Sequence, residues 1–161
     1  MTENPFILDQ KIQAILSQTT PLLPAPELHS FVVQRQAAAG REVILGMAQD
    51  PLFGPLLMFG SGGRHVEVFQ DIAFRVLPLT DVDAHEMVAS IKGYQLLTGF
   101  RGEPAVDLVM AEEMVLRLAQ LVSDFDCIQE MDINPFILAS HRANCMAVDV
   151  RIRLASTSEE E

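Results

Sequence analysis

The sequence predicts an α+β fold, a mainly antiparallel sheet with helices packed on one side. Two observations carry this prediction. Apolar runs of strand length follow one another with turn-like segments between them, as in successive hairpins. Segments with apolar residues three and four positions apart flank and interrupt these runs, which is the periodicity of amphipathic helices. Strands joined in this way pair antiparallel, and the helices then cover one face of the sheet.

Composition and charge limit the classes of function. With 161 residues, 49% of them hydrophobic, the chain is long enough for one domain with its own core. The formal net charge of −11 argues against nucleic acid as a partner, because neutralising phosphates needs clustered Lys and Arg. Only two lysines occur, Lys11 and Lys92, although enzymes that handle nucleotide phosphates usually use a positioned lysine.

The apolar runs and the cysteines indicate a cytoplasmic protein. No run approaches the roughly 20 apolar residues that span a bilayer. The N-terminus also lacks the basic and apolar segments of a secretory signal, so we expect no membrane partner. Cys127 and Cys145 lie in apolar, strand-like runs, which favours reduced, buried thiols over a secreted disulfide framework. A bridge between these two cysteines stays open from the sequence.

The N-terminal part of the chain is predicted to hold one helix and a strand hairpin. Residues 1–6 show no anchoring pattern, whereas residues 7–18 carry an apolar stripe of helical spacing. Three prolines within residues 19–26 exclude a continuing helix and make this segment a connector. We expect paired strands at 29–36 and 42–49, because β-favouring residues surround a short loop that ends in glycine.

An apolar strand and a glycine-rich turn follow. Residues 56–59 are apolar throughout, which is typical of a strand buried on both faces. The turn Gly-Ser-Gly-Gly at 60–63 could cradle a phosphate through its backbone N–H groups or serve as a tight hairpin turn. Neither a Lys-Ser or Lys-Thr pair nor a helix comes next, so the hairpin is favoured, with its return strand at 64–69.

The next predicted strand, residues 72–79, contains an arginine in an otherwise apolar run. Burying the guanidinium of Arg75 without a partner is costly. Arg75 therefore lies on the open face of the sheet or pairs with an anion. An ion pair with a nearby acid such as Glu67 or Asp71, with a purely structural role, is the alternative.

Two helices are predicted between this strand and the end of the sheet. Thr80 followed by Asp81 and Asp83 is the pattern of an N-cap with acids in the first turn, and it opens a helix to about residue 92. Residues 94–97 fit a second short turn. The longest helix is expected at 105–123, where the apolar stripe consists of Leu108, Ala111, Val115, Leu118, Ala119 and Val122.

The last predicted strands place polar groups together. In the run 130–138, polar and apolar residues alternate, so Asp132 and Asn134 share one face. The run 147–152 contains Asp149. If the runs 130–138 and 147–152 pair as a hairpin, the side chains of Asp132, Asn134 and Asp149 come together on one face. Such ligands suit Mg²⁺, which proteins hold with one or two carboxylates plus substrate phosphates. Because Asp-x-Asn is short and common, spacing alone favours a merely polar outer face.

Several runs taken together resemble the ATP-grasp region of NDP-forming acyl-CoA synthetases such as acetate–CoA ligase and succinyl-CoA synthetase. The resemblance covers roughly residues 8–153 and rests on many short motifs in register. They are VVQ (32–34), GREVILG (40–46), FGPLLMFGSGG (53–63), VEV (66–68), DIAFRVLPL (71–79), IKGY (91–94), LTGFRG (97–102), DINP (132–135) and AVD (147–149).

This resemblance implies a reaction and a set of ligands. The family couples acid, CoA and ATP, or another nucleoside triphosphate, to acyl-CoA, ADP and phosphate, with Mg²⁺ as cofactor. By resemblance, Asn134 and Asp149 fall on the Mg²⁺ ligands with Asp132 beside them. Arg75 falls on a strand arginine that faces the nucleotide cleft. Nucleotide contacts from Glu67 and Glu42 are weaker expectations.

The resemblance extends only to the second, C-terminal lobe of the ATP-grasp fold. We expect residues 7–154 to form this lobe and residues 155–161 to be an acidic tail. The expected partners are a first lobe and CoA-binding domains or a subunit that carries them. His65 stands where the family has an apolar or aromatic residue, so no phosphohistidine role is assigned to it. The chain is thus a piece of a longer enzyme, a separate subunit or a remnant.

Two other functions stay open alongside the catalytic one. A lobe that keeps the fold could bind nucleotide or dock a partner subunit as a non-catalytic regulatory module. Exposed apolar surface where the first lobe would pack favours that module, and self-association through this surface would be its sign. A degenerate fold without a ligand is the third alternative.

Overall fold

The chain forms two units, residues 1–36 and residues 37–161. The computed structural model describes residues 5–19, 34, 36–63 and 71–155. In the first unit, the helix α1 spans Pro5–Thr19 and contains the expected segment 7–18. Ile12 and Leu16 are half-buried on this helix. The strand expected at 29–36 falls almost wholly outside the described residues.

The second unit is built on one antiparallel sheet, which confirms the predicted fold class. Its strands are β1 (Arg41–Asp50), β2 (Gly54–Ser61), β3 (Ile72–Val76), β4 (Ile128–Leu138), β5 (Met146–Ala147) and β6 (Val150–Leu154). The order is β3-β2-β1-β4-β5, and β6 also pairs with β4. β1 therefore lies at the centre of the sheet, between β2 and β4.

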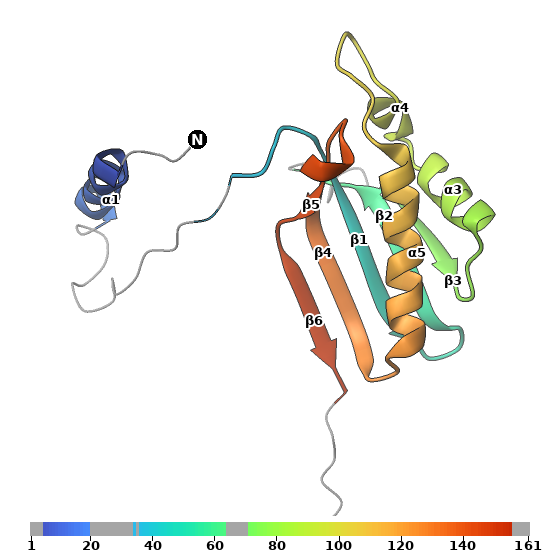
Figure 1. Ribbon diagram of the computed structural model, residues 1–161. Helices are drawn as coiled ribbons and strands as arrows, with labels where there is room; N and C mark the ends of the chain where they lie inside the picture. Colours follow the sequence, from blue (N-terminus) through green and yellow to red (C-terminus); the bar gives the residue numbers. More distant parts are fainter. Residues whose placement is uncertain (1–4, 20–33, 35, 64–70, 156–161) are drawn as a thin grey trace, which may run out of the picture. The chain divides into compact units, whose positions relative to one another are not determined.

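Helices cover one face of this sheet. They are α3 (Asp81–Ala89), the short α4 (Tyr94–Leu97) and α5 (Leu108–Asp124), and a 3₁₀ turn, η2 (Arg142–Asn144), joins β4 to β5. Figure 1 shows α5 lying against the sheet and running roughly along its strands, with α3 beside it near β3. The other face carries no helix from the described residues of the 37–161 unit, and we call it the open face.

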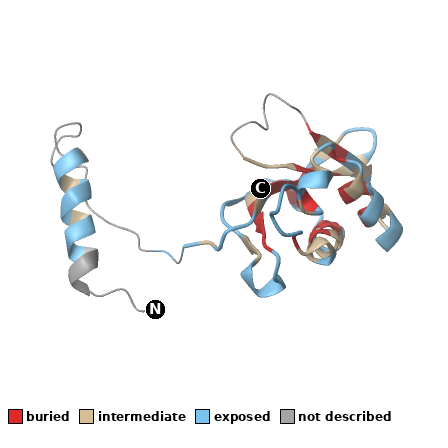
Figure 2. Cartoon of the chain, turned by 90° about the horizontal axis from the view of Figure 1, so that it is seen from above, coloured by how far each residue is buried: buried red, intermediate tan, exposed pale blue. Residues whose placement is uncertain are grey.

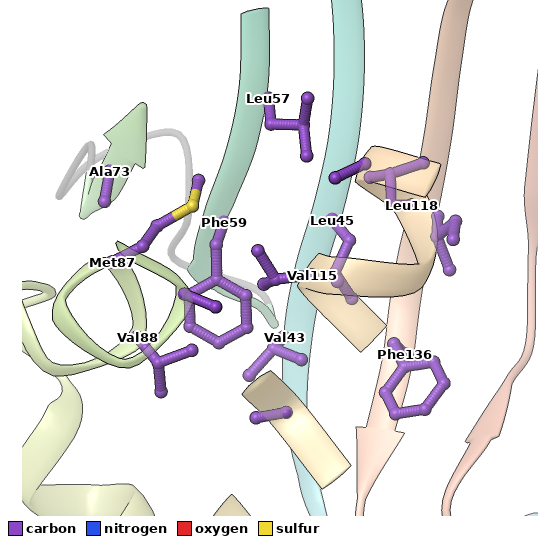
Figure 3. Close-up of a cluster of buried hydrophobic side chains, with 14 of the residues drawn as sticks. Val43, Leu45, Leu57, Phe59, Ala73, Met87, Val88, Val115, Leu118 and Phe136 are labelled. Atoms are coloured by element: carbon purple, nitrogen blue, oxygen red, sulfur yellow. The ribbon is translucent and has the colours of Figure 1, made fainter. Parts of the chain in front are cut away.

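The core lies between the sheet and these helices. Alternate residues of the central strands point into it, among them Val43 and Leu45 of β1 and Phe59 of β2. Val115 and Leu118 of α5 meet them from the other side (Figure 3). Figure 2 shows buried residues on the strands and on the helices of this unit. Because side chains alternate along a strand, the intervening residues face the open side.

Strand and helix ends differ from the sequence-based expectations in physically clear ways. The strand expected to be buried on both faces buries Leu57 and Phe59 but leaves Leu56 and Met58 partly exposed, because helices cover only one face. The strand predicted at 72–79 ends at Val76. The strand predicted at 64–69 lies outside the described residues.

The helix caps follow the sequence signals. The Thr80 hydroxyl accepts a hydrogen bond from the Asp83 backbone N–H at 3.2 Å, and the Asp83 carboxylate accepts one from the Thr80 N–H at 2.8 Å. This reciprocal capping box begins α3. α5 begins later than predicted because Asp107 caps it, its carboxylate accepting from the Met110 N–H at 2.9 Å.

The cysteine prediction needs one correction. Both thiols are free, but Cys127 is exposed and Cys145 is only partly buried, because Cys127 lies in the turn before β4 rather than in the strand. In the described part of the chain, no helix is long and apolar enough to cross a membrane.

Candidate functional site

β4 presents two of the predicted metal ligands on the open face. Met131 and Ile133 are buried in the core beneath the helices, so Asp132 and Asn134 point the other way. The pairing with β1 shifts register between Leu45, opposite Ile133, and Val43, opposite Phe136. A bulge of this kind re-aims side chains, and the exposed Asn134 lies within it.

Asp149 comes to lie beside Asn134, although the predicted strand around it is interrupted. The Asn134 N–H donates to the Asp149 carbonyl at 3.0 Å, and the Val148 N–H donates to the Pro135 carbonyl at 3.0 Å. Val150 pairs with Ile133 on the helix-covered face. Asp149, its neighbour, therefore shares the open face with Asn134 and Asp132. We call Asp132, Asn134 and Asp149 the metal edge.

The donor set of the metal edge fits a hard cation such as Mg²⁺. Its side chains offer carboxylate and amide oxygens, and the Asp149 side chain is 52% exposed. Among the residues that the structure describes, the side chains of Asp132 and Asn134 make no hydrogen bond and no ion pair, so their oxygens are available. No group of three or more His, Cys, Asp or Glu residues placed to hold a metal ion occurs within those residues. Two carboxylates and an amide match a site completed by substrate phosphates.

Two arginines of β6 stand next to the metal edge, and neither was predicted as a site residue. Arg151 pairs with Asp132 across the strands, and its guanidinium lies 3.5 Å from an Asp149 carboxylate oxygen. Arg153 lies 3.0 Å from the Glu130 carboxylate. A shallow hollow of about 270 Å³ is lined by Glu130, Asp132, Arg151, Ile152 and Arg153. The signal was present in the sequence, because Arg151 and Asp149 are two positions apart in one predicted strand.

Arg75 lies apart from the metal edge. It pairs with Leu57, a core residue, and so belongs to the helix-covered face rather than the open face. Its guanidinium donates to the Phe74 carbonyl at 2.9 Å. Hydrogen bonds from Thr80 lower the pKa of Asp83 on α3, and the charge of Arg75 adds to this effect. This register does not place Arg75 on the face where a nucleotide cleft was expected.

Glu42 stays on the open face, at the end of β1 that adjoins the glycine-rich turn. Val43 points into the core, so the exposed Glu42 points away from it. Its carbonyl accepts a hydrogen bond from the Gly62 N–H at 2.8 Å. Glu42 and the turn residues Ser61 to Gly63 line a hollow of about 320 Å³. Glu67, the other predicted nucleotide contact, lies outside the described residues.

Asp71 organises this end of the sheet, a role that the sequence pattern did not indicate. Its carboxylate accepts hydrogen bonds from the Ser61 hydroxyl at 2.5 Å and from the backbone N–H groups of Lys92 at 2.5 Å and Gly93 at 2.7 Å. Burial alone would raise the pKa of Asp71, but the hydrogen bonds from Ser61, Gly93 and Lys92 outweigh it and lower that pKa. Asp71 thus ties the glycine-rich turn to the segment before α4.

Comparison with known proteins assigns the chain to a family. The sequence profile of a family described as an ATP-grasp domain matches residues 3–154. The chain belongs to the ATP-grasp domain family. The structure of dinucleotide-forming acetyl-coenzyme A synthetase 1 of Ca. Korarchaeum cryptofilum, with CoA, acetyl-CoA and a phosphorylated phosphohistidine segment, aligns at a TM-score of 0.78 and 35% identity. That alignment covers 95% of this ATP-grasp chain and 67% of the other.

Two curated relatives of this ATP-grasp chain are named as ADP-forming CoA ligases. It is 43% identical over 128 residues to 4-hydroxybutyrate–CoA ligase (ADP-forming) of Nitrosopumilus maritimus, covering 80% of this chain and 18% of that protein. It is 37% identical over 153 residues to subunit beta of acetate–CoA ligase (ADP-forming) II of Pyrococcus furiosus, covering 94% and 65%. The chain therefore spans less than a fifth of the first relative and just under two thirds of the second.

Proposed function

We propose that this ATP-grasp chain supplies the Mg²⁺- and nucleotide-binding lobe of an ADP-forming acyl-CoA synthetase. The reaction would convert an acid, CoA and ATP into acyl-CoA, ADP and phosphate. The observation that supports it most is the metal edge, where a backbone hydrogen bond of 3.0 Å joins Asn134 to Asp149. The relatives with 37% and 43% identity are named as CoA ligases of this type.

Within this proposal, the residues of the open face orient a nucleotide rather than react with it. Asp132, Asn134 and Asp149 would hold Mg²⁺, which neutralises charge on the phosphates during phosphoryl transfer. Asp132 and Asn134 lie in β4, and the Asp149 carbonyl accepts a hydrogen bond from the Asn134 N–H, so little reorganisation of the backbone is needed when the ligand binds. Glu42, farther along the same face, is proposed as a nucleotide contact. Arg75 is left out of this set because its register places it on the helix-covered face.

The catalytic assembly is proposed to contain more than this lobe. A first ATP-grasp lobe and CoA-binding domains would complete the site, either in the same polypeptide or in a partner subunit. The Pyrococcus furiosus relative is named as a subunit beta, and the chain covers 65% of it. A related acetyl-coenzyme A synthetase structure, 43% identical and with a TM-score of 0.70, is a complex with CoA and Mg-AMPPCP. Both observations support an assembly in which several parts meet.

Calorimetric titration of the full chain with Mg²⁺ and ADP tests the metal edge. We expect Asn134→Ala and Asp149→Ala each to weaken Mg-ADP binding by at least about tenfold, because each removes one oxygen ligand. The matched control is Asn144→Ala, a replacement of an exposed asparagine in η2. Equal Mg-ADP affinity for the wild type and both metal-edge variants would overturn the proposed function.

A further inference from the structure

Arg151 lies beside the metal edge and forms a long ion pair with one of its acids. Its backbone pairs with that of Asp132, and its guanidinium lies 3.5 Å from the Asp149 carboxylate. Of the arginine–carboxylate pairs among the described residues, this one has the longest separation. The Arg151 side chain is also 79% exposed. An exposed, long ion pair contributes little to folding stability, so stability alone does not account for this placement.

The charge balance among Asp132, Asp149 and Arg151 changes when a cation binds. Asp132 and Asp149 carry two negative charges, and Arg151 offsets one of them in the free chain. A divalent cation on the carboxylates neutralises both, and the Arg151 guanidinium then has no acid left to pair with. Its backbone remains fixed in β6, two residues from Asp149. The positive charge is consequently held next to any anion that shares the metal.

The chemistry of the guanidinium selects phosphate as that anion. Its planar set of donors matches two phosphate oxygens at once, and a charge-assisted pair of this kind is stronger than a neutral hydrogen bond. The chain has only two lysines, so arginine must provide most cationic contacts. Among the described arginines, Arg41, Arg117, Arg142 and Arg153 lie closer to a carboxylate than Arg151 does.

We propose that Arg151 is a phosphate-binding residue of the metal edge, which rests on the proposed function. In the free chain, its guanidinium pairs with Asp149. When the metal occupies the carboxylates, the guanidinium turns to the phosphate oxygens of the nucleotide that the metal holds. Arg151 therefore couples the two events, opposing the bare cation and favouring the cation–nucleotide complex.

The neighbouring Arg153 provides a matched control. It lies on the same strand and the same open face, and it pairs with Glu130 at 3.0 Å. Its side chain is 65% exposed, comparable to that of Arg151. It is two residues farther from Asp149, however, and it pairs with an acid outside the metal edge. Replacing it removes the same charge from the same strand but leaves the Arg151–Asp149 pair in place, so it controls for the loss of a positive charge near the metal edge.

The test uses the full chain with Mn²⁺ as a spectroscopic probe for Mg²⁺, and electron paramagnetic resonance counts the free ion. We expect the Arg151→Gln variant to bind Mn²⁺ alone at least about twofold more tightly than the wild type, because a competing positive charge is gone. We expect the same variant to bind Mn-ADP about tenfold more weakly, because a phosphate contact is lost. Arg153→Gln should stay within about twofold of the wild type for both ligands. Thermal melting of each variant checks that the exposed substitutions leave the fold intact.

The opposite signs of the two changes separate this role from general damage, which would weaken both ligands. If the Arg151→Gln variant binds Mn-ADP as tightly as the wild type, or no more weakly than the Arg153→Gln variant, the proposed role of Arg151 is overturned. The proposed metal site is not affected by that result. If the Asn134→Ala and Asp149→Ala variants bind Mn²⁺ as tightly as the wild type does, the proposed function itself is overturned. The role of Arg151 then falls with it.

Discussion

Asp71 shows how one buried side chain holds several segments together. Ser61 ends β2, Asp71 precedes β3, and Lys92 and Gly93 precede α4, so three separate parts of the chain meet at one carboxylate. The residue is only 8% exposed. Its hydrogen bonds favour the charged form strongly enough to lower its pKa despite burial. Its contribution to folding stability should therefore depend on its charge.

Replacing Asp71 by Asn should lower the free energy of unfolding by about 1–3 kcal/mol at pH 7, because an amide cannot accept all three hydrogen bonds. Urea denaturation followed by circular dichroism measures this change. Asp126→Asn, in an exposed turn, is the control and should change stability by less than about 0.5 kcal/mol. Equal effects of the two substitutions would contradict the assigned role of Asp71.

The stability contribution of Asp71 should also depend on pH with a definite sign. Its pKa is lowered from the ordinary value of 3.8 in the folded chain. The unfolded chain thus takes up the proton first, and the contribution is complete above pH 3.8 and disappears as the pH falls through the lower folded-state pKa. Between pH 6 and pH 3, the wild type should lose more stability than Asp71→Asn. Parallel pH profiles would rule this linkage out.

Secondary-structure elements were predictable where local chemistry decides them. The Thr80 cap and the apolar stripe of α5 are readable because their partners lie within a few residues. The alternation that puts Asp132 and Asn134 on one face is equally local. The break between β5 and β6 was not predictable, because it depends on the bulge in β4 and its pairing with β1. The register of Arg75 and the contacts of Asp71 depend on distant strands in the same way.

Gly93 gives an element-level test of the turn that precedes α4. An added Cβ there would collide with the Ser61 hydroxyl and lie 3.0 Å from the Asp71 carboxylate. We expect Gly93→Ala to lower the free energy of unfolding by about 1–3 kcal/mol through disruption of these hydrogen bonds. In the double variant with Ser61→Ala, the collision is relieved, so the combined loss should be smaller than the sum of the single losses. Additive losses would exclude this coupling.

The two faces of the sheet in the 37–161 unit have different roles. One face is packed against α3 and α5 and supplies the core, while the open face carries the metal edge on β4 and β6. Phe74 and Val76 of β3 pair with Met58 and Leu56, so they lie on the same open face and are 50% and 42% exposed. The open face thus carries charged residues of both signs at one side and apolar residues at the other.

The apolar side of the open face should make the chain self-associate. Light scattering coupled to gel filtration should show a mass that rises with concentration, because exposed apolar area is removed from water on association. Phe74→Ser should reduce this rise. Phe53→Ser is the control, since Phe53 is 64% exposed in the turn between β1 and β2 and lies off the open face. A mass that stays monomeric at all concentrations, or equal effects of both substitutions, would contradict the prediction.

The most direct measurement is nuclear magnetic resonance of the ¹⁵N-labelled chain during addition of Mn²⁺, whose unpaired electrons broaden nearby amide signals. Signals of residues 132–134 and 148–151 should broaden first, and Asn134→Ala with Asp149→Ala should abolish this broadening. Broadening that begins at the acids of α5, Glu112 and Glu113, or that persists at residues 132–134 in the double variant, would contradict a metal site on the open face.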